Sequence, residues 1–170
     1  PHNGGLSYDF DNRNRMIKRT DGLGQVETWA YDVMSRPTRY TDRRGFTSHY
    51  EYDALGRHIL TTYHDGTTVA STYDAGNRRL SLNDSASGVL AWEYDGLDRI
   101  VRVVSAQGEV NYGYDLVGRR TSMVADNQPE MRYIYDDGDR LIGQQQLGEV
   151  VEYTYDSVNR RTSMTLPNQV

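Results

Sequence analysis

Residues 52–57 read Tyr-Asp-Ala-Leu-Gly-Arg, and the frame of this short stretch recurs along the whole chain. A Tyr-Asp dipeptide is present eight times, and an Arg stands five residues after each of its tyrosines. Successive tyrosines are 20 to 23 residues apart, and a sustained period of this length predicts a repeat architecture. The copies are Tyr8, Asp9 and Arg13; Tyr31, Asp32 and Arg36; Tyr52, Asp53 and Arg57; Tyr73, Asp74 and Arg78; Tyr94, Asp95 and Arg99; Tyr114, Asp115 and Arg119; Tyr135, Asp136 and Arg140; and Tyr155, Asp156 and Arg160.

The residue before each arginine predicts a tight turn. Seven of the eight are Gly, Asn or Asp, the types that best tolerate a positive φ. The frame therefore predicts a left-handed residue there, together with a β-bulge. Ser35, which precedes Arg36 and Pro37, is the exception, and we expect its turn to be strained or different. The seven are Asn12, Gly56, Asn77, Asp98, Gly118, Asp139 and Asn159.

The residues on either side of this turn predict two strands per repeat. Upstream of the tyrosine, aromatic and apolar residues alternate with polar ones, as expected for a half-buried strand. A second short stretch follows the arginine, as in residues 80–82, and a Gly six or seven residues before the next tyrosine predicts a second turn in six repeats. The fold class is therefore all-β: antiparallel β-hairpin repeats, with about two strands per 21 residues, in one long sheet. Sixteen strands at about 4.8 Å each would extend about 75 Å, so we expect the sheet to curve or spiral.

Composition excludes several classes of protein. Only 36% of the 170 residues are apolar, but 14 Tyr and a net charge of only −5 argue against disorder, so we expect a folded chain with a thin core in which tyrosines carry much of the burial. No run of 18 apolar residues could span a membrane. The absence of Cys excludes disulfides and thiolate metal sites, and a pI near 5.3 offers no basic field for nucleic acid.

The repeated frame resembles the YD repeat of the Rhs family. The resemblance extends from Tyr8 to Arg161, and eight copies in series make it specific. Similar repeats occur in bacterial Rhs polymorphic toxins, in the C components of ABC toxin complexes, in wall-associated bacterial proteins and in teneurins. The resemblance implies a sheet that spirals into a hollow shell, which in the bacterial proteins encloses a C-terminal toxin and is not itself an enzyme.

By this resemblance, residues 1–170 form a single array of eight YD units, a segment of a larger shell. The family's autoprotease motif contains Asp-Pro, which this sequence lacks, and about 16 strands make an arc rather than a closed vessel. The implied partners are neighbouring repeats of a parent chain and its toxin cargo. The implied location is outside a bacterial cell or on its surface, with delivery by a secretion apparatus. The alternative is a cell-surface adhesion or carbohydrate-binding module.

Other residue types that could carry chemistry have simpler interpretations. The Tyr-Asp aspartates could bind a metal or act as bases, but the same residue in eight copies favours Asx-turns or pairing with the Arg four residues on. The repeated arginines could stack on neighbouring tyrosines. The stretches 9–12 and 136–139 are similar to calcium loops but lack the twelve-residue spacing. His2, His49, His58 and His64 form no zinc motif, and His49 and His58 fall in different strands of one hairpin. We therefore expect no enzyme, no cofactor and no metal.

A ladder of aromatic residues leaves two interpretations open. Six repeats carry an aromatic residue two positions before the tyrosine, on the same face of the strand. These side chains either form the thin core or offer flat surfaces on which sugars stack. The six are Trp29, Tyr50, Trp92, Tyr112, Tyr133 and Tyr153. Both terminal strands would also be unpaired, which predicts edge-to-edge oligomers as a further possibility.

Overall fold

A computed structural model describes residues 5–167, and this part of the chain is all-β. Its sixteen antiparallel strands follow sequence order in the sheet, which confirms the predicted hairpin repeats. Within the described residues there is no helix that could cross a membrane. The strands are β1 (Ser7–Phe10), β2 (Met16–Thr20), β3 (Val26–Tyr31), β4 (Pro37–Thr41), β5 (Thr47–Tyr52), β6 (His58–Thr62), β7 (Thr68–Tyr73), β8 (Arg79–Asp84), β9 (Gly88–Tyr94), β10 (Ile100–Ser105), β11 (Gly108–Tyr114), β12 (Arg120–Ala125), β13 (Met131–Tyr135), β14 (Leu141–Gln146), β15 (Glu149–Tyr155) and β16 (Arg161–Thr165).

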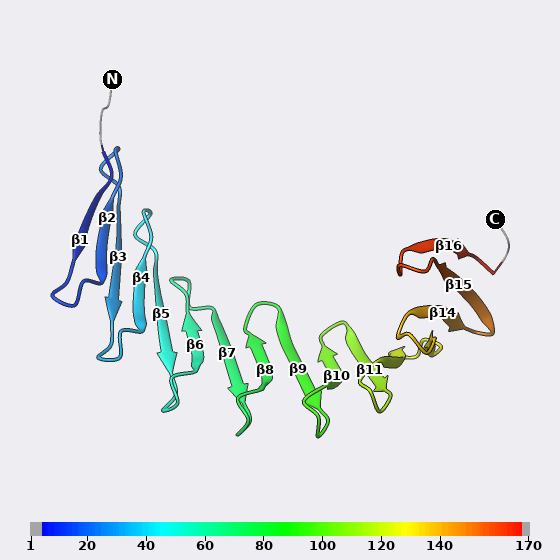
Figure 1. Cartoon of the computed structure of the whole chain (residues 1–170). Helices are drawn as coiled ribbons and strands as arrows, with labels where there is room; N and C mark the ends of the chain where they lie inside the picture. Colours follow the sequence, from blue (N-terminus) through cyan, green and yellow to red (C-terminus); the bar gives the residue numbers. More distant parts are fainter. Residues whose placement is uncertain (1–4, 168–170) are drawn as a thin grey trace. The chain divides into compact units, whose positions relative to one another are not determined.

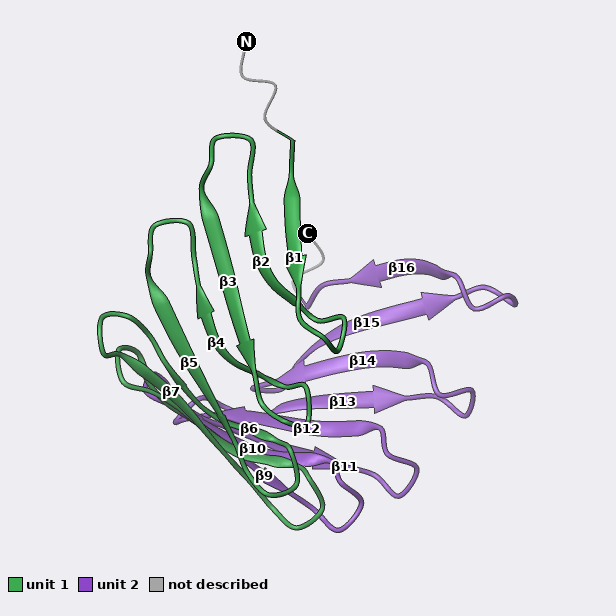
Figure 2. Cartoon of the chain, turned by 90° about the vertical axis from the view of Figure 1, so that its left-hand side faces the viewer, with its two compact units in different colours: residues 1–89 green, residues 90–170 purple. Residues whose placement is uncertain are grey.

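The chain divides into two compact units, Pro1–Val89 and Leu90–Val170. Figure 2 colours the first unit green and the second purple. In each unit the chain runs through consecutive hairpins, and a strand contacts only the strands next to it in sequence (Figure 1). Each unit is therefore a row of hairpins whose contacts are all between neighbours.

Every hairpin carries a β-bulge, and in all but the first hairpin it lies at the tyrosine of the repeat. In the hairpin of β5 and β6, Glu51 lies opposite Leu60, whereas Tyr52 lies opposite His58. The residue between His58 and Leu60 is therefore left unpaired, which is the geometry of a bulge. The same shift in register interrupts each of the other hairpins.

Six of the seven predicted left-handed residues have this conformation, each in the turn of its hairpin. Gly56 and Gly118 have φ values of +83° and +92°, and Asn77, Asp98, Asp139 and Asn159 lie between +63° and +66°. Ser35 has the same conformation, with φ of +64°. Its N–H donates to Asp32 O at 3.1 Å, as the Gly56 N–H donates to Asp53 O at 3.0 Å. Of the two expectations for Ser35, a different turn was wrong, because the surrounding hydrogen bonds impose the common geometry. The expected strain is present, because a serine occupies the left-handed region.

The first copy of the repeat is placed differently from the prediction. The bulge of the first hairpin falls at Asp9 and Phe10, and the left-handed residue is Asn14, with φ of +60°, rather than Asn12. Phe10, Asp11 and Arg15 therefore occupy the positions that the sequence analysis gave to Tyr8, Asp9 and Arg13. This correction gives the first repeat the same 21-residue spacing as the next, because Phe10 precedes Tyr31 by 21 residues.

The predicted thin core is not present in the described residues. They include no buried hydrophobic side chain, and the only buried polar residues are Thr61 and Ser71. The repeat tyrosines from Tyr31 to Tyr155 are half-buried, while Tyr8 and Phe10 are exposed. The physical reason is that the strands within each unit contact only their sequence neighbours, so no second layer of the same unit covers the side chains. Hydrogen bonds and ion pairs between neighbours must therefore contribute much of the stability.

Candidate functional site

The aspartate of each repeat organises its own turn. In the third repeat, Asp53 Oδ1 accepts the backbone N–H groups of Leu55 and Arg57, both at 2.9 Å. Asp53 Oδ2 accepts from Arg57 Nε at 2.6 Å. The Asp53 N–H donates to Arg57 O at 3.0 Å, which closes the turn. Both interpretations of the aspartate are thus realised together, because it forms the Asx-type bonds and also pairs with the arginine four residues on.

The arginine then reaches the next repeat. Arg57 Nη1 donates to Asp74 O at 2.8 Å, and its guanidinium carbon lies 4.8 Å from the centre of the Tyr73 ring. The Tyr73 hydroxyl in turn donates to His58 O at 2.9 Å. The aspartate, its arginine and the tyrosine of the following repeat therefore form one connected unit, which we call the Asp–Arg–Tyr staple.

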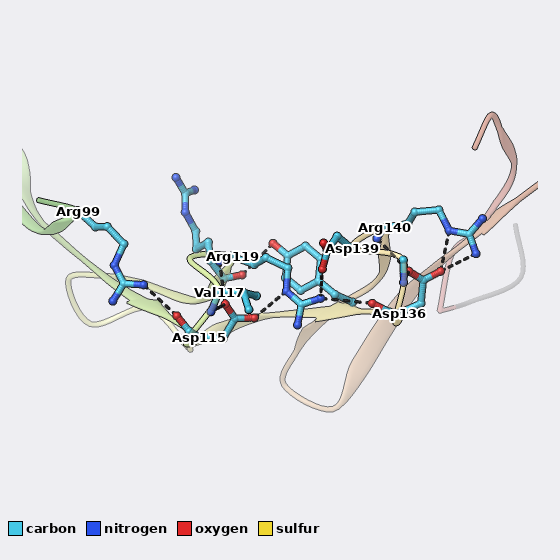
Figure 3. A network of polar contacts seen from close by, with 10 residues as sticks. Arg99, Asp115, Val117, Arg119, Asp136, Asp139 and Arg140 are labelled. Carbon is cyan, nitrogen blue, oxygen red and sulfur yellow. Dashed lines mark hydrogen bonds and ion pairs between the residues drawn. The ribbon is translucent and has the colours of Figure 1, made fainter. Parts of the chain in front are cut away.

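The staple recurs with little variation within both units. The arginine carbon lies 4.7 to 5.3 Å from the next ring for Arg15, Arg36, Arg57, Arg99, Arg119 and Arg140. The tyrosine hydroxyl donates at 2.8 or 2.9 Å to the residue after that arginine in the pairs Tyr31–Met16, Tyr52–Pro37, Tyr73–His58, Tyr114–Ile100, Tyr135–Arg120 and Tyr155–Leu141. Figure 3 shows this chain of contacts from Arg99 to Arg140. There, Arg119 Nη1 donates to both Asp136 O, at 3.3 Å, and Asp139 Oδ1, at 2.8 Å.

The hydrogen bonds of the staple keep its aspartates ionised. The Arg140 guanidinium, followed by the Arg140 backbone N–H, holds the pKa of Asp136 below its ordinary value. At Asp32 the backbone N–H of Arg36 is the strongest cause of the lowered pKa, and burial opposes it. Burial raises the pKa of the Tyr52 and Tyr135 hydroxyls. A carboxylate that accepts this many donors is a poor proton acceptor at neutral pH.

The two stretches that are similar to calcium loops are occupied by cationic side chains. Asp11 pairs with Arg15 at 2.7 Å, and Asp9 lies 3.5 Å from Lys18. Asp136 and Asp139 accept from Arg140 and Arg119. Between residues 5 and 167, no three His, Asp or Glu side chains converge on a common metal position.

The structure does not bring the histidines together. His58 Nε2 lies 3.0 Å from Thr61 Oγ1, and His64 stacks on Phe46 with ring centres 3.8 Å apart. His49 lies opposite Thr62 rather than His58. His2 lies outside the described residues.

The aromatic ladder is half-buried at all six positions. The guanidinium of Arg120 lies 4.7 Å from the centre of the Tyr112 ring, and that of Arg161 lies 5.6 Å from Tyr153. Trp29 contacts Tyr40, with ring centres 5.3 Å apart. These neighbours occupy part of the ring surfaces that a stacked sugar would need.

A charged cluster in the first unit was missed in the sequence. Glu27, whose side chain is only 12% exposed, lies 2.6 Å from Arg19 Nε and 3.6 Å from Arg43 Nε. The Tyr40 hydroxyl donates to Glu27 Oε1 at 2.9 Å, and Arg43 also pairs with Asp21 at 3.3 Å. Arg19 Nε and Glu27 Oε2 have no aligned hydrogen-bond partner in the described chain, so their short contact is an ion pair. The signal was Glu27 itself, a charged residue at a strand position that is apolar in most other repeats.

Two models of known protein families match the sequence of these repeats. The model of the teneurin YD-shell matches residues 32–166, which is most of the chain. The chain belongs to the teneurin YD-shell family. A model of the RHS repeat also matches the YD-shell chain over residues 10–47, beginning at Phe10, where the structure places the first staple.

Solved structures share the fold of this YD-shell chain at low sequence identity. The Photorhabdus luminescens Tc holotoxin pore with mutation TccC3-D651A is 16% identical, with a TM-score of 0.71 over 92% of this chain. The TcdB2-TccC3-Cdc42 structure is 17% identical, with a TM-score of 0.70 over 92% of this chain. In both cases the match covers only 10% of the other chain. No curated protein sequence matches the YD-shell chain.

Proposed function

We propose that residues 1–170 are a non-enzymatic array of eight YD units that forms part of a shell and that, in a longer parent protein, the shell encloses a C-terminal toxin. The observation that carries this proposal is the Asp–Arg–Tyr staple. The aspartates and arginines, the groups best suited to chemistry, are used to join one repeat to the next. A sheet whose charged side chains are used in this way is suited to a structural role in a shell rather than to catalysis.

The comparisons support the proposal at the level of the fold. The family is one of structural shell repeats, and one solved structure of similar fold is named as a Tc holotoxin pore. This chain spans only about a tenth of the length of those chains. The toxin cargo and a location outside a bacterial cell or on its surface are therefore proposed for the longer parent protein. Adhesion through bound glycans is less well supported, because arginines lie against the Tyr112 and Tyr153 rings.

The first experiment is to sequence the reading frame on both sides of residues 1–170. We expect further repeats with the Tyr-Asp and Arg frame, followed by a domain of unrelated sequence. A frame that leads instead into wall-binding or membrane segments would contradict the shell and favour adhesion.

A second experiment tests enclosure in that longer protein. Limited proteolysis should leave the terminal domain protected in the wild type and cut it faster in Arg119→Gln, which removes one staple. Arg119→Lys keeps the charge and reports on the loss of the guanidinium contacts alone. Leu116→Ala is the matched control, because this turn residue is fully exposed. A terminal domain that is cut equally fast in the wild type and all three variants would contradict enclosure.

A further inference from the structure

The chain contains four Asp-Gly dipeptides, and aspartate isomerises most readily when a glycine follows it. The backbone nitrogen of the next residue attacks the aspartate side chain, and glycine has no Cβ to hinder that approach. Because all four sites share this glycine, we expect their reactivities to differ through the contacts of each aspartate. The dipeptides are Asp21-Gly22, Asp65-Gly66, Asp95-Gly96 and Asp137-Gly138.

Two of the four aspartates are held by the turns of the first unit. Asp21 Oδ1 accepts the N–H groups of Leu23 and Gln25 at 2.9 and 3.0 Å. Asp65 Oδ1 accepts the N–H and the hydroxyl of Thr67 at 2.9 and 2.7 Å. The Gln25 N–H holds the pKa of Asp21 below its ordinary value, and the Thr67 hydroxyl lowers the pKa of Asp65.

The third aspartate belongs to a staple. Asp95 accepts the N–H groups of Leu97 and Arg99 at 2.8 and 3.0 Å, and Arg99 Nε donates to it at 2.7 Å. The Arg99 side chain is the strongest cause of the lowered pKa of Asp95. Isomerisation starts from the protonated carboxyl, whose hydroxyl leaves as water, so donors that favour the ionised form reduce the reactive fraction.

Asp137 differs from the other three because its carboxylate has no partner. It is exposed in the turn between β13 and β14, and among residues 5–167 its side chain accepts no hydrogen bond and joins no ion pair. The glycine nitrogen does not explain the difference. The Gly138 N–H donates to Asp136 Oδ1 at 2.9 Å. The Gly66 N–H is engaged in the same way, by Tyr63 O at 3.0 Å. The Asp137 carboxyl can therefore turn toward the Gly138 nitrogen without breaking a contact of its own.

We propose that Asp137 is a site of spontaneous isomerisation to isoaspartate. The Gly138 nitrogen attacks Asp137 Cγ, a C–N bond forms, and the carboxyl hydroxyl leaves with the amide hydrogen as water. Water then cleaves the succinimide at its main-chain carbonyl, so the chain continues through Cβ and Cγ and the former carbonyl becomes a carboxylate. One water is lost and one is regained, so the step needs no oxidant or reductant. The inference does not depend on the proposed function.

The atom that isomerisation adds to the backbone falls inside the staple of the seventh repeat. Asp136 Oδ1 accepts the N–H groups of Gly138 and Arg140, both at 2.9 Å. Asp139 accepts from Arg119 of the preceding repeat at 2.8 Å (Figure 3). A longer link between Asp136 and Asp139 displaces these groups, so the isomerised chain should lose this staple.

Peptide mapping of the purified chain during warm storage at neutral pH tests the site. Isoaspartate keeps the mass of aspartate but resists the protease Asp-N, and electron-transfer fragmentation locates it. We expect it to accumulate at Asp137 at least about fivefold faster than at the other three sites, because each of those must first break a hydrogen bond. In urea that unfolds the chain, the four sites should convert at similar rates. Equal rates in the folded chain, or a lead of Asp137 that persists in urea, would overturn the proposal.

Gly138→Val is the matched control for the reaction. Val117 takes the same position in the turn of the preceding repeat, and a Cβ at Gly138 would come no closer than 3.4 Å to its neighbours. The variant should lose the isoaspartate signal at Asp137 and keep the urea midpoint of the wild type. Isoaspartate that forms at the wild-type rate in this variant would contradict attack by the Gly138 nitrogen.

Limited proteolysis of the stored wild-type chain tests the effect on the staple. Chains that carry isoaspartate at position 137 should be cut faster, so the intact fraction should contain less isoaspartate than the digested fraction. Equal contents in the two fractions would overturn the predicted loss of the staple.

Discussion

Ser35 adopts a backbone conformation in which most repeats place Gly, Asn or Asp. Its φ of +64° matches those of Asn77 and Asn159, but a serine side chain does not favour the left-handed region. The Ser35 hydroxyl accepts from Arg15 Nη1 at 3.2 Å, as Asn77 Oδ1 accepts from Arg57 Nη1 at 3.1 Å. An asparagine would therefore keep the contact and reduce the backbone strain.

We expect Ser35→Asn to raise the free energy of unfolding by about 0.5–1 kcal/mol, because Asn tolerates this φ better than Ser. Urea denaturation measured on the purified chain would detect the change. Asn77→Ser is the reciprocal control and should lower stability by a similar amount. A loss of stability in Ser35→Asn, or a gain in Asn77→Ser, would mean that φ does not govern stability at this turn position.

The staple aspartates predict acid sensitivity. Hydrogen bonds from Arg140 hold the pKa of Asp136 below its ordinary value, so its ionised form stabilises the folded chain. This contribution is complete above the unfolded-state pKa of about 3.9 and is lost as pH falls through the lower pKa of the folded state. We expect Tm to be nearly constant from neutral pH to about pH 5 and to fall below about pH 4. Asp136→Asn should lower Tm at neutral pH and reduce its acid dependence, and an unchanged acid slope would contradict the assignment.

At the scale of the element, a hairpin is joined to the next by one hydroxyl, one guanidinium and the strand ladder. The Tyr114 hydroxyl donates to Ile100 O at 2.8 Å, and Arg99 lies over the same ring. We expect Tyr114→Phe to lower the free energy of unfolding by about 1 kcal/mol, the net value of one hydrogen bond. Chemical denaturation measures this loss.

Tyr8→Phe is the matched control for this substitution. Tyr8 belongs to a Tyr-Asp dipeptide, but the structure places it outside the staple and exposes it. Its replacement should change stability by less than about 0.5 kcal/mol. Equal losses for the two substitutions would contradict the corrected register of the first repeat.

The hairpins and their turns could be predicted from the sequence, because the 21-residue period and the Gly, Asn and Asp residues encode local backbone geometry. The register of the first repeat could not be predicted from the dipeptide alone. Tyr8-Asp9 imitates the motif, whereas Phe10-Asp11 lacks the tyrosine and still forms the turn. The 21-residue step back from Tyr31 leads to Phe10, and it was the signal in the sequence that the analysis missed.

Contacts between repeats were harder to predict. The stacking of arginine on a neighbouring tyrosine could be foreseen from the chemistry of the two side chains. The carbonyl that accepts each tyrosine hydroxyl depends on strand register, which the sequence does not specify directly. The ion pairs of Glu27 likewise depend on β2 lying beside β3 and on the position of the turn after β4.

At the scale of the whole molecule, the repeat contacts are interchangeable. Removing residues 32–52 deletes 21 residues and places Asp53 directly after Tyr31. Arg15 then keeps the Tyr31 ring, the Asp53 carbonyl takes the place of the Asp32 carbonyl, and Arg57 keeps its partners. We expect this variant to unfold cooperatively, with a urea m-value reduced in proportion to its length, because stability in a repeat array is the sum of units and interfaces. Removing residues 32–41 instead takes out one strand, reverses the hairpins that follow and should abolish cooperative unfolding. A similar loss in both deletions would contradict interchangeability.

The staple depends on only a few residue positions in each repeat. A repeat needs the aromatic ring, the aspartate, a left-handed turn residue and the arginine, and four positions in 21 are 4/21, or about 19%. Two arrays that shared only these residues would therefore show about the 16% identity that separates this chain from a solved structure of the same fold. The contacts of the staple make no demand on the side chains at the remaining positions of each repeat, so a search for related arrays can follow the spacing of these few residues rather than overall sequence similarity.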